Sequence, residues 1–145
     1  PTTLTKVEGY AFYGCGNLST LNLGNTAVKT VNSSAFSYCS KLKEIEFPNS
    51  ITSIGSSALY SCTSLRKVTF GENLTSVGSD ALRYCNTLDT IVWNVKTFSI
   101  TSYSSSPFYS VYSQIKSFTF GRRMKNVTAA EIFLCYTEAI EAERR

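Results

Sequence analysis

The residues of this chain best suited to chemistry are its five cysteines, because the sequence contains no histidine. Successive cysteines are 24, 23, 23 and 50 residues apart, and Val111 stands where the long interval would hold one more. The five are Cys15, Cys39, Cys62, Cys85 and Cys135. Zinc sites usually bring their ligands together through short spacings such as CxxC, which this chain lacks. Even spacing instead places each cysteine at the same point of a repeated unit.

A column of cysteines in a stacked repeat would face the interior, where a reduced cysteine behaves as a small apolar residue. We favour this structural role. A disulfide between neighbouring coils remains an alternative, because coils about 5 Å apart lie within reach of such a bridge. Without histidine, the usual Cys-His and Ser-His nucleophile pairs are excluded. We therefore expect no catalytic residues, no metal, no cofactor and no enzyme activity.

Two carboxylates form the best remaining pair for acid-base chemistry. Glu44 and Glu46 alternate along one predicted strand, so both face its polar side. A simpler interpretation is that Glu44 faces Lys67 of the next unit as an exposed ion pair. Such a pair contributes only a few tenths of a kcal/mol. We favour this second interpretation.

The repeated unit indicates how these side chains are positioned. It reads L-x-x-V-x-x-x-A-F-x-x-C-x-x-L-x-x-I-x-F, and residues 51–70 contain a nearly complete copy. The final I-x-F puts two apolar side chains on one face of a strand, with a polar side chain between them. Stacked units would form a parallel sheet with an apolar inner face. Serine or aspartate before the A-F pair could cap one short helical turn.

The fixed columns of residues 51–70 resemble the BspA-like leucine-rich repeat, and the resemblance covers about residues 4–135. It implies an α/β fold, namely a right-handed solenoid of about six coils. A parallel sheet would line its concave face and short helical turns its convex face. Members of this family are cell-surface or secreted proteins, several of which act in adhesion. The family implies no catalytic residues.

We expect one domain over residues 1–137, with an irregular coil at 94–114, where one repeat is longer than the others. Residues 138–145 have a helix-forming composition and would be a C-terminal cap or linker. No signal peptide and no membrane-spanning apolar run is recognisable, and the start at Pro1 suggests processing or truncation. The N-terminal coil has no polar cap, which would allow end-to-end self-association.

The net charge of +4 raises the question of nucleic-acid binding. Such binding needs a basic stripe that successive units present together. The basic residues instead occupy different columns, with clusters at 122–125 and at the last two positions. We therefore expect no nucleic-acid partner.

We expect a binding or adhesion module that presents its surface to a protein or glycan. The alternative is a structural spacer of a longer surface protein with no ligand of its own. The first candidate surface is the outer strand face, comprising Glu44, Glu46, Lys67, Thr69, Thr90, Val92, Ser117 and Thr119.

The second candidate surface is an aromatic bulge with the Tyr/Ser composition of adaptable binding loops, although a tolerated insertion would look the same. Its aromatic residues are Tyr103, Phe108, Tyr109 and Tyr112. A tyrosine stripe on the turns could either shield the coil edges or bind a partner. It comprises Tyr13, Tyr38, Tyr60, Tyr84 and Tyr109, with Phe133 as its last member.

Overall fold

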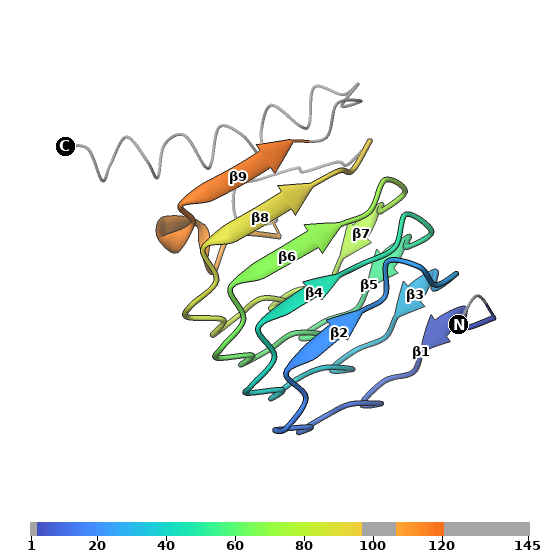
Figure 1. The fold of residues 1–145 in the computed structure, drawn as a ribbon, viewed down its shortest axis with the longest axis horizontal. Coiled ribbons are helices and arrows are strands. Elements are labelled where there is room, and N and C mark those ends of the chain that lie inside the picture. The colour runs from blue at the N-terminus through green and yellow to red at the C-terminus, as the bar shows by residue number, and fades with distance from the viewer. Residues whose placement is uncertain (1–2, 97–106, 121–145) are drawn as a thin grey trace.

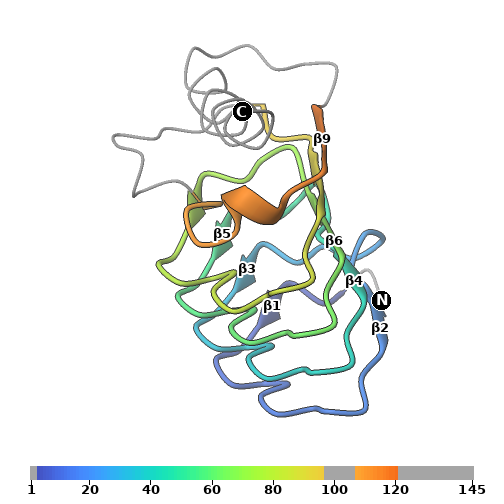
Figure 2. The same cartoon turned by 90° about the vertical axis from the view of Figure 1, so that its left-hand side faces the viewer.

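The computed structural model describes residues 3–96 and 107–120. These residues form stacked coils that contribute strands to two parallel sheets (Figures 1 and 2). The four-stranded sheet consists of β1 (Lys6–Val7), β3 (Thr30–Val31), β5 (Ser53–Ile54) and β7 (Ser76–Val77). The five-stranded sheet consists of β2 (Thr20–Asn22), β4 (Glu44–Glu46), β6 (Lys67–Phe70), β8 (Thr90–Trp93) and β9 (Ser117–Phe120). We number coils 1 to 5 by these last five strands.

The five-stranded sheet confirms the predicted strand alternation. Ile45, Val68 and Ile91 pair with one another in register and are at most 1% exposed. The residues on either side of them point outward, as expected when successive side chains alternate between the two faces of a sheet. The apolar inner face of this sheet therefore forms one wall of the core.

The four-stranded sheet is not anticipated by the sequence analysis. Each strand has only two residues and ends in a β-branched residue of the unit's first apolar pair, such as Val31 or Ile54. Two residues are too few for alternation to be visible in a sequence. The sheet forms because stacking places equivalent segments of successive coils side by side.

The cysteine column lies in the core between the sheets and the turns. Cys39, Cys62 and Cys85 are free thiols with no exposed surface, which confirms the buried column for these three. Each thiol donates a hydrogen bond, 3.0–3.2 Å long, to a carbonyl of the preceding coil. Val111 occupies the same column and is 1% exposed. Cys15 is exposed, because no coil of the described residues precedes its own.

The predicted short helical turns are absent from coils 1 to 4. Phe36 N and Tyr38 N donate to carbonyls of the next coil, at 2.8 Å each, while the N–H group of Ser37 between them donates to the carbonyl of Ser34, three residues back. A helix would keep all these bonds within one segment. Ser34 and Tyr38 also have positive φ, which a right-handed helix excludes. Positive φ recurs at Tyr10, Gly14, Ser57, Ser61, Asp80 and Tyr84.

Coil 5 contains the only helical segment of the described residues, a 3-10 turn η2 at Tyr112–Gln114. Part of the predicted irregular coil, residues 97–106, lies outside the described residues, and so do residues 121–145. The predicted boundary at 137 and the cap at 138–145 therefore remain predictions. No helix among the described residues is long and apolar enough to cross a membrane.

Candidate binding surface

The outer face of the five-stranded sheet brings together all eight residues of the first candidate set. Sheet register aligns them in two columns that run across the coils. The first column is Glu44, Lys67, Thr90 and Ser117, and the second is Glu46, Thr69, Val92 and Thr119. All eight are exposed or half-exposed. The eight residues therefore lie on one face of the sheet, as the strand alternation in the sequence predicts.

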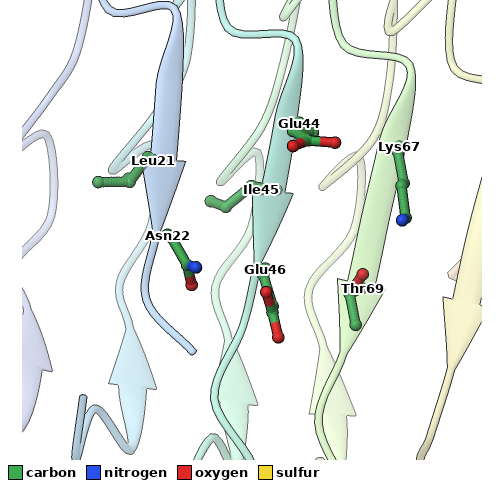
Figure 3. Close-up of a pocket in the computed structure, with 7 residues that line it drawn as sticks. All are labelled: Leu21, Asn22, Glu44, Ile45, Glu46, Lys67 and Thr69. Carbon is green, nitrogen blue, oxygen red and sulfur yellow. The ribbon is translucent and has the colours of Figure 1, made fainter. Parts of the chain in front are cut away.

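A groove of about 90 Å³ crosses this face between β2, β4 and β6 (Figure 3). We call it the sheet groove, and it is lined by Leu21, Asn22, Glu44, Ile45, Glu46, Lys67 and Thr69. Pockets that hold small organic ligands usually measure about 300–1,000 Å³. The sheet groove is therefore large enough for the end of one partner side chain rather than for a separate cofactor.

The charges around the sheet groove are not neutralised by one another. Glu44 lies opposite Lys67 in the sheet register, but the predicted ion pair between them is not formed. The Glu46 side chain also has no ion pair or hydrogen bond within the described part of the chain. By contrast, Asp80 and Glu72 pair with Arg83 and Lys96, at 3.6 and 2.9 Å.

Asn22 is a lining residue that the candidate set omitted. It occupies the position of Glu46 in coil 1, and its side-chain oxygen accepts a hydrogen bond of 2.7 Å from the backbone N–H of Gly24. This bond fixes the amide at one end of the sheet groove. Because Asn22 lies in the same column as Glu46, the repeat pattern of the sequence could have identified it as a lining residue.

The aromatic bulge is not a single surface. Phe108 is 4% exposed, so its assignment as a partner-binding residue is wrong. Its ring packs against those of Trp93 and Phe118, with centroids 5.2 and 5.3 Å away. The reason is positional, because Phe108 occupies the inward column that Leu82 fills in coil 4. Tyr103 lies outside the described residues, whereas Tyr109 is exposed and Tyr112 half-exposed.

The tyrosine stripe forms a ladder of touching rings along the turns. Tyr13, Tyr38, Tyr60 and Tyr84 are linked by centroid distances of 5.3–5.7 Å, with rings inclined by 63–83°. Tyr13 and Tyr60 precede the cysteine of their coil by two residues, whereas Tyr38 and Tyr84 precede theirs by one. Phe12 and Phe36, which occupy the same column of adjacent coils, stack with only 12° between their rings, whereas the staggered tyrosines meet edge to face. The stagger supplies this geometry, and edge-to-face contacts of this kind are generally favourable.

The buried thiols of Cys39 and Cys62 are poorly suited to nucleophilic chemistry. Burial, with a smaller contribution from the neighbouring Cys62 and Cys15, raises the pKa of Cys39 from 9.0 to about 11. A hydrogen bond with Cys85 and burial also raise the pKa of Cys62. Reactive cysteines instead have lowered pKa values and access to solvent. Among the described residues, no group of three or more metal-ligating side chains could hold a metal ion.

Solved structures of leucine-rich repeat proteins resemble this chain, two of which illustrate the likeness. The T. pallidum leucine-rich repeat protein TpLRR matches with a TM-score of 0.55 and 20% identity, over 93% of this chain and 80% of its own. A leucine-rich repeat protein from Bacteroides ovatus matches with a TM-score of 0.52 and 21% identity, over 86% of this chain. This chain spans 37% of the Bacteroides protein's length. At these identities the likeness shows the fold alone.

The family comparison is decisive. No curated protein matches the chain. The model of the BspA type leucine-rich repeat region, however, matches residues 5–137 in six copies. This match covers nearly the whole chain and agrees with the 23- to 24-residue period of the cysteine column. The chain therefore belongs to the BspA-type leucine-rich repeat family.

Proposed function

We propose that this chain is a non-catalytic binding module that contacts a protein partner through the outer face of the five-stranded sheet. The family supports this role, since leucine-rich repeat proteins generally act as protein-interaction modules. The family also supports action at a cell surface or in secreted form. A glycan carried by the partner would be the alternative ligand.

The observation that carries the proposal is the set of charges around the sheet groove. Glu44, Glu46 and Lys67 are exposed and have no partners within the described residues. Charges of both signs at fixed positions favour a partner with the complementary pattern, and they influence the rate and specificity of binding more than raw affinity. The small volume of the groove suits one inserted side chain.

The test measures binding to a panel of purified, immobilised extracellular glycoproteins, each with and without enzymatic removal of its glycans. The Glu44→Lys/Glu46→Lys double variant reverses the acidic pair, and Glu8→Lys reverses a carboxylate of coil 1 that is already paired with Lys6, at 3.5 Å. We expect the double variant to lose binding that wild type and Glu8→Lys retain.

Each other outcome contradicts part of the proposal. Binding that disappears only when glycans are removed would make the ligand a glycan. Equal binding by the wild type and the double variant would exclude the sheet groove. No binding to any member of the panel would favour the structural spacer.

A further inference from the structure

A second and larger depression lies where the chain turns from the cysteine segments into the five-stranded sheet. We call it the corner pocket. Its volume is about 350 Å³, and it is lined by Lys43, Thr63, Ser64, Arg66 and Thr87. This volume falls within the range of pockets that hold small ligands or ligand groups. The sheet groove and the corner pocket share no lining residue.

Two cations flank the corner pocket at neighbouring positions. The backbone N–H of Arg66 donates a hydrogen bond of 2.7 Å to the carbonyl of Lys43, so the two side chains leave adjacent coils at the same level. Neither side chain forms an ion pair within the described part of the chain. No carboxylate lines the pocket. Two like charges held close together repel one another, and a bound anion would relieve that repulsion.

The hydroxyl groups add neutral donors. Thr87 Oγ1 bonds to the carbonyls of Thr63 and Leu65, at 3.0 and 2.9 Å, which fixes one wall of the pocket. The hydroxyls of Thr63 and Ser64 have no hydrogen-bond partner among the described residues. Both can therefore donate to a ligand. The pocket thus combines a planar guanidinium, a compact ammonium and two hydroxyl donors.

This combination is local to coils 2 and 3. Backbone hydrogen bonds connect Lys43 and Arg66 to the equivalent positions of the other coils. From coil 1 to coil 5, the residues at this position are Ser19, Lys43, Arg66, Asp89 and Lys116. Asp89 follows Arg66, so adjacent cations do not recur in coils 4 and 5. The Asp89 carboxylate accepts a hydrogen bond of 2.9 Å from Thr90 Oγ1. The corner pocket is therefore a specific feature rather than a consequence of the repeat.

We propose that the corner pocket binds a tetrahedral oxyanion, either a sulfate or a phosphate monoester group of a ligand. Guanidinium and ammonium groups form strong charge-assisted hydrogen bonds to such oxygens. The two hydroxyls provide further donors, so the pocket suits a group with three or more acceptor oxygens.

The test is a calorimetric titration of the protein with inorganic sulfate and, separately, inorganic phosphate, with sodium chloride holding the ionic strength constant. We expect wild type to bind at least one anion, and Arg66→Gln and Lys43→Gln each to weaken that binding about tenfold. Lys29→Gln is the matched control, because Lys29 is exposed, precedes β3 and contributes the same charge outside the pocket. It should leave the affinity unchanged.

The remaining variants separate this proposal from simple charge attraction and from the proposed function. Thr63→Val/Ser64→Ala should weaken binding while leaving the net charge unchanged, whereas Glu44→Lys/Glu46→Lys should not abolish it. The anion that binds more tightly identifies sulfate or phosphate as the source. The proposal is overturned if neither anion binds, or if Lys29→Gln weakens binding as much as Arg66→Gln.

Discussion

The cysteine column and the two columns of the outer sheet face pass through the same coils but differ in how much their residue types vary. Cys39, Cys62 and Cys85 repeat one residue type in one environment, without exposed surface. The first outer column instead changes from Glu44 to Lys67 in adjacent coils. An inward position must fit the coils above and below, so its size and polarity are fixed. An outward position has no such constraint and is available for recognition.

The largest effect is expected at the centre of the cysteine column. Cys62→Asp should unfold the described coils, because an unpaired buried carboxylate costs several kcal/mol. Cys62→Ala should reduce the free energy of unfolding by only about 1 kcal/mol, through loss of a small side chain. Urea denaturation followed by circular dichroism would measure both. Equal, mild effects would contradict the buried position of this column.

The tyrosine ladder should show an intermediate effect. Tyr60 contacts the rings of Tyr38 and Tyr84, so Tyr60→Ala should cost about 1–2 kcal/mol of unfolding free energy. Tyr10 contacts one ring of the ladder, that of Tyr13, and is 64% exposed. Tyr10→Ala should therefore cost less than half as much by the same denaturation assay. A reversed order would show that the ladder does not stabilise the coil edges.

The cysteine column should also make stability depend on alkaline pH. The pKa of Cys39 is raised to about 11 in the folded state, so above about pH 9 the unfolded chain releases a proton that the folded chain retains. The free energy of unfolding should be unaffected by this group below pH 9 and should fall as the pH rises from 9 to 11. Urea midpoints at about pH 8 and about pH 10 would measure the fall. Cys39→Ala should make the fall smaller, and an unchanged fall would contradict the assignment.

The smallest effect on stability is expected on the outer face of the five-stranded sheet. Glu46 is exposed and has no ion pair among the described residues, so Glu46→Gln should change the free energy of unfolding by less than about 0.5 kcal/mol. Thermal unfolding would measure this. The same variant should weaken partner binding in the immobilised-glycoprotein assay. A marked loss of stability would instead give Glu46 a structural role.

Predictions from the sequence are wrong where contact with a neighbouring coil determines the conformation. Ser34 and Tyr38 looked compatible with a helical turn, but hydrogen bonds to the next coil hold these turns in an alternating conformation. Phe108 looked like a surface aromatic residue within a polar loop, yet it fills the inward column. Glu44 and Lys67 were placed opposite one another, as the register confirms, but their side chains do not meet. Side-chain direction and long-range hydrogen bonds are not visible in a periodic pattern.

The sequence alone determined the period, the family, the inward columns and the strand register, because burial between identical neighbours imposes the same residue types at fixed intervals. Only the tertiary structure decided that the turns are not helices, that a second sheet exists, and that the charges around the sheet groove are unpaired. It also brought Lys43 and Arg66 to one pocket with Thr63 and Ser64. These features depend on how adjacent coils meet in space, and residues far apart in the sequence contribute to each.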